Sequence, residues 1–284
     1  QTLNVVLWDS NYWTHMPPGC LRLGNYIYHN TYTSSTHSCG YNGYNCLELS
    51  GEDIYAQRYA ADGTKQGSEF LVNTYTLFNQ QNPSVATLDA GKFVVAWESQ
   101  MQVSTSYGYD VYAQRYAADG TREGSEFLVN ALHVSNDQMR PSVAHLGSGK
   151  FVVVWDSYSQ DASYEAIIAR IYAADGTITV SEITVNTYTS YIQKSPSVAH
   201  LGSGKFVVAW MSSHNQDGSD YGVYAQRYKA DGTPEYKADG TTPDEFLVNT
   251  HTTLNQVNPS VAALDSGKFV VAWQSWNQVS GSSG

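Results

Sequence analysis

The chain has 284 residues, with 15 basic and 26 acidic side chains and a formal charge of −11. This charge argues against nucleic acid as a partner, because nucleic acid and anionic membranes bind clustered Lys and Arg. No apolar run is long enough to span a bilayer, so no membrane insertion is expected, and no motif indicates a cofactor.

Residues 1–51 predict an incomplete first unit that is interrupted by a cysteine-containing insertion. Residues 4–10 resemble one strand of the repeat described below, and the rest of the segment does not. All three cysteines lie here, and the short loop between Cys39 and Cys46 makes these two the preferred disulfide pair, leaving Cys20. A disulfide implies an oxidising, extracellular or cell-surface setting; three unrelated buried thiols are the alternative.

Residues 52–284 form one continuous repeat domain, in which a unit of about 55 to 60 residues recurs in tandem. Four motifs return in the same order. Pro-Ser-Val-Ala begins at Pro83, Pro141, Pro196 and Pro259, and Phe-Val-Val-Ala-Trp or a close copy ends at Trp97, Trp155, Trp210 and Trp273. Copies of Val-Tyr-Ala-Gln-Arg-Tyr lead to Asp-Gly turns at Asp62, Asp119, Asp175 and Asp231, and the last motif ends at Asn73, Asn130, Asn186 and Asn249.

Each unit predicts four short antiparallel strands, because Asp-Gly between apolar runs is a strong hairpin signal. The second strand alternates Phe93, Val95 and Trp97 with further apolar residues, so both of its faces are apolar. Such a strand lies in a sheet that is covered on both sides. The sequence therefore predicts an all-β fold, a β-propeller or a closely related stacked array of four-stranded antiparallel sheets.

The two ends of the chain leave incomplete units. The first unit lacks its first strand, and the last unit lacks its third and fourth strands. Three explanations stay open: the ends pair with each other, the sequence is a window on a longer array, or successive molecules complete one another's sheets. Because unpaired strand edges template strand addition, the third explanation predicts head-to-tail self-association into a polymer.

The motif order VNTYT, PSVA, GKFVVAW, VYAQRY-x-ADGT and SEFLVN over residues 52–277 resembles a tandem repeat of large extracellular proteins of bacteria and of some ciliates. In bacteria such repeats often accompany adhesin-like or calcium-binding secretion modules. The resemblance implies a secreted or cell-surface location and a structural or adhesive role. It implies no catalytic residues.

Side chains of the third strand are the best candidate contacts. Tyr112, Gln114 and Tyr116 form a polar-aromatic stripe that suits a glycan or a neighbouring subunit, with a solvated face as the alternative. Arg115 lies on the opposite side and is replaced by Ile171 in the next unit, which favours packing of its aliphatic stem over function. The repeated tryptophans end apolar strands, so we expect them in the core.

No set of residues specifies a reaction. A propeller hydrolase needs carboxylates that converge at one mouth of the central channel, and the acids beside the predicted inner strands, Asp89 and Asp265, belong to hairpin turns. The loop at residues 215–220 has too few acids for calcium, and the histidines lack zinc-ligand spacing. We therefore expect no enzyme and no catalytic, cofactor-binding or metal-binding residues.

The sequence predicts a non-catalytic extracellular structural or adhesive repeat protein, in the leading version a subunit of a surface filament assembled by strand completion. The alternative is a lectin-like β-propeller that binds glycans between units. Self-association and glycans are accordingly the two expected partners.

Overall fold

The computed structural model describes residues 20–23, 26–29, 46–47, 51–103, 108–158, 160, 164–213, 216–218 and 220–278. Within these ranges the chain consists of strands, loops and short 3-10 turns. β1 (Cys20–Leu23), β2 (Tyr26–His29) and β3 (Cys46–Leu47) form a small separate sheet. Cys39 and the strand predicted at residues 4–10 lie outside the described residues, so neither the disulfide nor that strand is tested.

The rest of the described chain repeats an antiparallel sheet of four strands. The first complete sheet contains β6 (Gln80–Thr87), β7 (Phe93–Gln100), β8 (Tyr109–Tyr116) and β9 (Arg122–Leu128). The next contains β10 (Gln138–Gly147), β11 (Lys150–Tyr158), β12 (Glu165–Tyr172) and β13 (Ile178–Thr184). The last complete sheet contains β14 (Gln193–Gly202), β15 (Lys205–Ser213), β16 (Tyr221–Tyr228) and β17 (Phe246–Leu247).

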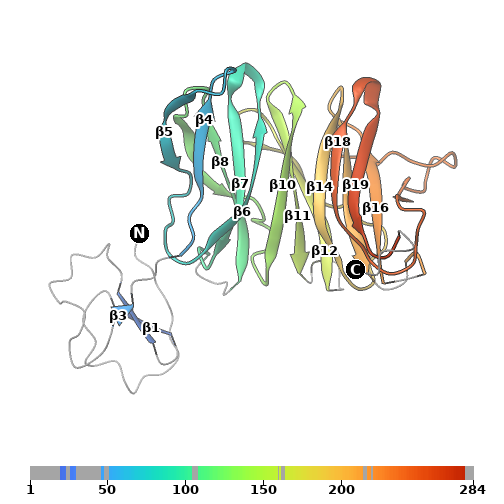
Figure 1. Ribbon diagram of the computed structural model, residues 1–284, viewed down its shortest axis with the longest axis horizontal. Coiled ribbons are helices and arrows are strands. Elements are labelled where there is room, and N and C mark those ends of the chain that lie inside the picture. The colour runs from blue at the N-terminus through green and yellow to red at the C-terminus, as the bar shows by residue number, and fades with distance from the viewer. Residues whose placement is uncertain are drawn as a thin grey trace.

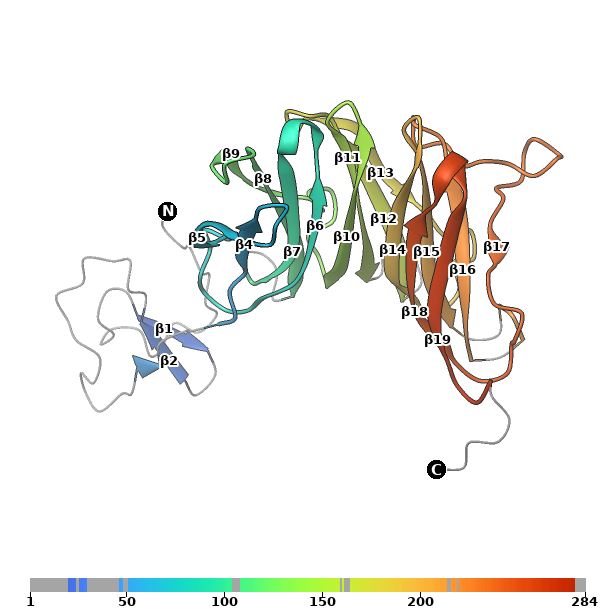
Figure 2. The same cartoon turned by 45° about the horizontal axis from the view of Figure 1, so that its top comes forward.

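Partial units stand at the two ends of this series, so we number the units from one to five. β4 (Tyr55–Tyr59) and β5 (Lys65–Leu71) are the third and fourth strands of unit 1. β18 (Gln256–Ala263) and β19 (Phe269–Ser275) are the first and second strands of unit 5. Each pair forms its own two-stranded sheet, and the two pairs lie at opposite ends of an open arc (Figure 2). The described strands β4 and β5 therefore do not pair with β18 and β19.

The sheets follow one another around the arc, with the first strands of successive units side by side (Figure 1). A repeated hydrogen bond joins the first strands of neighbouring units. Between units 2 and 3, the Ser84 Oγ accepts the Val143 N–H at 3.1 Å. The same bond recurs from Ser142 to the next unit. This arrangement confirms the predicted all-β, propeller-like array of four-stranded antiparallel sheets.

The apolar core lies between sheets rather than within any one of them. Val94 and Ala96 of β7 pack with Trp155 of the following unit, whereas Val95 and Trp97 pack toward the preceding unit. Burying both faces of such a strand removes apolar surface that a single sheet would leave in water. The side chains of Trp97, Trp155 and Trp210 are fully buried, which confirms their predicted place in the core.

A buried asparagine follows the fourth strand of units 1 to 4 and fixes the linker after it. The Asn73 Oδ1 accepts the Ile54 N–H at 2.8 Å, and its Nδ2 donates to the Tyr75 backbone oxygen at 2.9 Å. Equivalent bonds are made by Asn130, Asn186 and Asn249. The linker between β5 and β6 is thereby tied to the residue before β4 in unit 1.

Candidate functional site

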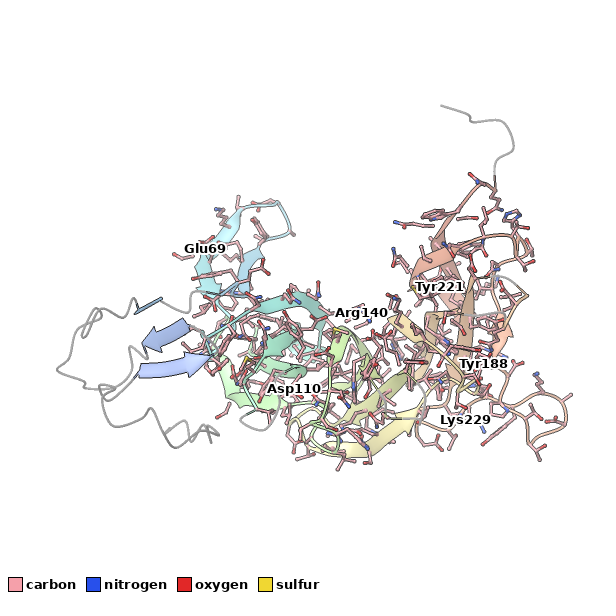
Figure 3. The ribbon with its side chains drawn as sticks, turned by 90° about the horizontal axis from the view of Figure 1, so that it is seen from below. Glu69, Asp110, Arg140, Tyr188, Tyr221 and Lys229 are labelled. Carbon is pink, nitrogen blue, oxygen red and sulfur yellow. The ribbon has the colours of Figure 1, made fainter. Side chains whose placement is uncertain are left out.

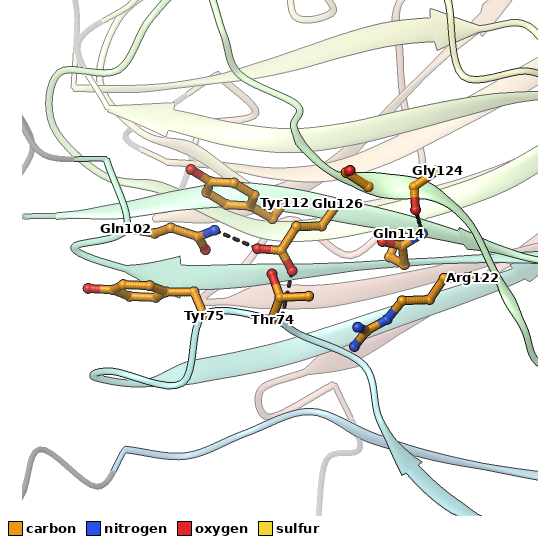
Figure 4. A pocket seen from close by; sticks show the side chains of 9 residues that line it. Thr74, Tyr75, Gln102, Tyr112, Gln114, Arg122, Gly124 and Glu126 are labelled. Atoms are coloured by element: carbon orange, nitrogen blue, oxygen red, sulfur yellow. Dashed lines mark hydrogen bonds between the residues drawn. The ribbon is translucent and has the colours of Figure 1, made fainter. Parts of the chain in front are cut away.

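A pocket of about 620 Å³ lies where units 1 and 2 meet, and we call it the junction pocket. Thr74 and Tyr75 of the linker form one wall, and Gln102 of the loop after β7 forms another (Figure 4). The remaining lining residues belong to β8 and β9: Tyr112, Gln114, Arg122, Gly124, Ser125 and Glu126. Tyr112 and Gln114 face the pocket because alternate residues of β8 point toward unit 1.

The carboxylate of Glu126 occupies the centre of the pocket. Its Oε2 accepts the Thr74 N–H at 2.7 Å, and its Oε1 accepts the Gln102 Nε2 at 2.6 Å (Figure 4). A carboxylate has about four lone-pair sites, so these two bonds leave acceptor capacity for a ligand. Glu126 therefore joins the two units and still presents negative charge to the pocket.

Gln114 has an unsatisfied acceptor in the pocket wall. Its side chain is fully buried, and its Nε2 donates to the Arg115 and Gly124 backbone oxygens at 2.8 and 3.2 Å. Its Oε1 is buried and has no hydrogen-bond partner among the described residues. Buried polar atoms are nearly always paired in folded proteins, so this unpaired acceptor is unusual.

Two tyrosine rings lie at one end of the pocket, with Arg122 toward the other (Figure 4). Burial raises the pKa of Tyr75 to about 12 and also raises the pKa of Tyr112, so both rings are neutral. The Tyr75 hydroxyl donates to the Met101 backbone oxygen at 3.2 Å. Tyr112 stacks on the buried Trp97, with 6.5 Å between ring centroids. Both tyrosines are thus held as fixed apolar surfaces.

The structure separates the three residues that the sequence singled out. Tyr112 and Gln114 line the junction pocket, whereas Tyr116 is 1% exposed and stacks on Phe93. The Tyr116 hydroxyl donates to the Val72 backbone oxygen of unit 1 at 3.1 Å. The stripe packs against the preceding unit, so the interpretation as a solvated face is wrong. Backbone carbonyls of the neighbouring unit provide the polar partners that solvent would otherwise supply.

Arg115 points the opposite way, toward unit 3. Its Nη1 donates to the Ala174 backbone oxygen at 2.8 Å, and its side chain is 14% exposed. The expectation that Arg115 packs its stem agrees with this burial, and the guanidinium adds a link between units.

Sequence reasoning did not single out Glu126 or Gln102. A signal for both was present, because each fourth strand carries a glutamate at the same position, and a glutamine follows each tryptophan-ended strand of units 2 to 4. The glutamates are Glu69, Glu126, Glu182 and Glu245, and the glutamines are Gln102, Gln160 and Gln216. The glutamates and the glutamines recur in different motifs, so the sequence alone does not indicate that they form hydrogen bonds with each other.

A second polar group lies where the first strands converge, beside a shallow pocket of about 300 Å³ that Arg140 helps to line. The Arg140 Nε and Nη2 donate to Asp156 at 2.8 and 2.7 Å, and the Arg140 N–H donates to the Glu98 Oε1 at 2.6 Å. Burial raises the pKa of Asp156 to about 7, although Arg140 opposes the rise. Both carboxylate residues are 1% exposed. Their oxygens face protein donors, which leaves little for a ligand to reach.

These inner acids come from second strands, not from the first strands in which the sequence argument looked for them. Asp89 and Asp265, the acids considered there, do lie in 3-10 turns. Across the described ranges, no three His, Cys, Asp or Glu side chains gather as metal ligands. No helix in the same ranges combines the length and hydropathy needed to cross a bilayer.

No family model matches the sequence, and no curated protein matches it. Solved structures with a similar fold include the GH93 alpha-L-arabinofuranosidase of Fusarium graminearum with arabinobiose, at 15% identity and a TM-score of 0.49 over 81% of this chain and 69% of that chain. An endo-1,4-beta-xylanase of Bacteroides thetaiotaomicron matches at 11% identity and a TM-score of 0.44 over 89% and 82% of the two chains. An endo-arabinase from the same organism matches at 13% identity and a TM-score of 0.43 over 67% and 68%.

These matches contradict the expectation of a non-catalytic structural or adhesive protein, and with it the expectation that the chain is no enzyme. The expectation was based on the repeat motifs. Those motifs consist of core and hairpin residues, which carry no information about catalysis. At identities this low, the likeness concerns the fold and assigns no activity. The expected glycan partner therefore stays a proposal, while self-association and a filament find no support.

Three expectations stay predictions. They are the resemblance to extracellular tandem repeats, the extracellular or cell-surface location, and the Cys39–Cys46 disulfide.

Proposed function

We propose that this protein is carbohydrate-active and binds a short glycan in the junction pocket. The observation that carries the proposal is the Glu126 carboxylate, with acceptor capacity left free, in a pocket that also holds two fixed tyrosine rings. The volume of about 620 Å³ lies within the range of roughly 300 to 1,000 Å³ that is typical of small-molecule sites.

The chemistry of the lining suits a sugar. A sugar ring presents C–H groups on its faces and hydroxyl groups around its edge. The rings of Tyr75 and Tyr112 offer apolar surface to the faces, because aromatic side chains combine an apolar body with restricted motion. Hydroxyl donors match the free lone pairs of Glu126, and the Arg122 guanidinium provides donors for sugar oxygens.

Binding is tested with a panel of disaccharides, namely arabinobiose, xylobiose, cellobiose and lactose, each titrated to millimolar concentration into the full chain. Isothermal calorimetry measures the dissociation constant. Gln102→Ala removes a lining amide and is expected to weaken binding by about tenfold, equivalent to about 1.4 kcal/mol.

Gln160→Ala is the matched control. Gln160 donates to Glu182 at 3.0 Å, as Gln102 donates to Glu126, but it lies in unit 3, away from the junction pocket. It is expected to leave the dissociation constant unchanged. Absence of binding by every disaccharide, or equal weakening by both substitutions, would contradict the proposal.

The same mixtures are assayed for newly formed reducing ends, because the fold occurs among enzymes that act on carbohydrates. Release of reducing ends that Glu126→Gln abolishes would extend the proposed role from binding to hydrolysis in this pocket. Hydrolysis that Glu126→Gln leaves intact would place the reaction elsewhere in the chain.

A further inference from the structure

We infer that the chain carries a second glycan site, built from the same residue types, where units 3 and 4 meet. The inference rests on the proposed function of the junction pocket. Six lining positions of the first site have identical residues in unit 4 and the linker before it. The pairs are Thr74 and Thr187, Tyr75 and Tyr188, Gln102 and Gln216, Tyr112 and Tyr224, Gln114 and Gln226, and Glu126 and Glu245.

The hydrogen bonds of the second site reproduce those of the first. Glu245 accepts the Thr187 N–H at 2.6 Å and the Gln216 Nε2 at 2.7 Å. Gln226 is fully buried, and its Nε2 donates to the Arg227 and Glu235 backbone oxygens at 2.8 and 3.1 Å. In the described part of the chain, its Oε1 is buried without a partner, as is that of Gln114.

The tyrosines also correspond. Tyr224 is 6% exposed and Tyr112 is 9% exposed. Burial raises the pKa of both, with smaller contributions from two neighbouring carboxylates and a tyrosine in each case. In order of size, those neighbours are Asp110, Glu126 and Tyr75 at the first site, and Asp217, Glu245 and Tyr188 at the second. Each site therefore groups two tyrosines around one glutamate.

The junction between units 2 and 3 shows that stacking of the units does not require this set. Gln160 and Glu182 are kept there and still bond, at 3.0 Å. The remaining four positions carry Ala131, Leu132, Ile168 and Arg170. Arg170 is 1% exposed and donates to Glu182 and to the Val129 backbone oxygen. Its guanidinium therefore occupies acceptor positions of the Glu182 carboxylate that a ligand would otherwise use.

This contrast separates two roles within the set. The glutamine–glutamate bond joins units 1 and 2, units 2 and 3, and units 3 and 4. The two tyrosines and the inner glutamine occur only where units 1 and 2 and units 3 and 4 meet. A need for packing alone does not explain why the two sites share all six residues while the junction between them shares two.

The two sites are set apart along the arc, with one complete junction between them. Asp110, on the strand that carries Tyr112, and Tyr188 lie in different parts of the arc (Figure 3). The two sites differ at one position of the fourth strand. In the strand pairing, Arg122 lies opposite Tyr116 at the first site, whereas Pro234 lies opposite Tyr228 at the second. The second site therefore lacks a guanidinium at this position. The arrangement gives one chain two sugar sites and, with a long glycan, two points of attachment.

Equilibrium dialysis counts the sites, with a labelled sample of whichever panel disaccharide binds most tightly. The unmodified chain and Gln160→Ala are expected to bind two molecules per chain at saturation. Gln102→Ala and Gln216→Ala are each expected to keep one site of unchanged affinity and to bind the second molecule about tenfold more weakly, because each substitution affects a different site. The double substitution is expected to bind both molecules about tenfold more weakly. Tyr75→Ala and Tyr188→Ala provide a second pair of variants, and circular dichroism confirms that each variant is folded.

The outcomes distinguish the two proposals. One molecule per chain, bound more weakly by Gln102→Ala and equally well by Gln216→Ala, overturns the second site and leaves the junction pocket as proposed. Two molecules per chain whose affinities Gln216→Ala leaves unchanged place the extra molecule elsewhere and also overturn the second site. Absence of binding by the unmodified chain overturns the proposed function and this inference with it.

Discussion

Arg170 and Glu182 form a buried ion pair at the junction of units 2 and 3, with 2.7 Å between the Arg170 Nη2 and the Glu182 Oε1. Their side chains are 1% and 4% exposed. Arg170 stands at the position that Gln114 occupies in unit 2, so this junction has an ion pair where the junction pocket has a neutral amide beside its glutamate.

Arg170→Met is expected to lower the free energy of unfolding by about 3 kcal/mol, because it leaves the charge of Glu182 buried without its cation. Arg170→Gln is expected to lower it by less, since glutamine at this position in units 2 and 4 bonds to backbone carbonyls beside a glutamate. Urea unfolding of the full chain, followed by tryptophan fluorescence, measures both. Equal losses for the two variants would contradict the role assigned to the charge.

Asn130→Ala is expected to lower the free energy of unfolding by about 2 kcal/mol, because the substitution leaves several buried polar groups without partners. The Asn130 Oδ1 accepts the Val111 N–H, and its Nδ2 donates to Asp110 and to the His133 backbone oxygen, each at 2.8 Å. The same urea titration measures the change. A loss below about 0.5 kcal/mol, the usual effect of an exposed site, would contradict this role.

The repeating strands could be predicted from the sequence because their signals are local. Asp-Gly turns fix the hairpins, and apolar residues on both faces of the second strand require a covering sheet on each side. β7 and β11 match the FVVAW motif and its copy, and their tryptophans lie in the core as expected.

The candidate site could not be predicted in the same way. An alternating run such as Tyr112, Gln114 and Tyr116 predicts one polar face, and only the neighbouring unit decides whether water or backbone carbonyls satisfy that face. Glu126 and Gln102 lie 24 positions apart in different motifs, so their hydrogen bond emerges from the folding of the sheet. The substitution of Gln114 by Arg170 is visible in the sequence, but its meaning depends on the distance between Arg170 and Glu182.

Asp110→Asn is expected to remove part of the pH dependence of stability between about pH 4 and pH 6. Burial raises the pKa of Asp110 from 3.8 to about 6. The folded chain therefore binds more protons than the unfolded chain in this window, and the free energy of unfolding falls as pH rises through it. Asparagine keeps an oxygen that accepts the Asn130 Nδ2, so the variant should be the more stable at pH 7 and show a flatter profile.

Asp119→Asn is the control for this measurement. Hydrogen bonds from Thr121 lower the pKa of Asp119, so its ionised form stabilises the folded chain above its unfolded pKa, and this contribution is lost as pH falls. The two substitutions are expected to change the profile with opposite signs. An Asp110→Asn profile with the slope of the unmodified chain would show that Asp110 ionises normally.

Gly149→Ala and Gly147→Ala separate backbone strain from close packing in one hairpin turn. Both glycines have left-handed φ angles, +72° and +90°, at which an alanine is disfavoured by about 1 kcal/mol. A Cβ on Gly149 would lie 2.5 Å from the Ala174 Cβ, whereas a Cβ on Gly147 meets nothing within 4 Å. Gly149→Ala is therefore expected to destabilise the chain by a further ~1 to 3 kcal/mol, as overpacking does.

Ala174→Gly should recover most of that excess in the Gly149→Ala background and none in the Gly147→Ala background. Urea titrations of the four variants measure this coupling, and an Ala174→Gly effect that is the same in both backgrounds would rule out the contact as its cause.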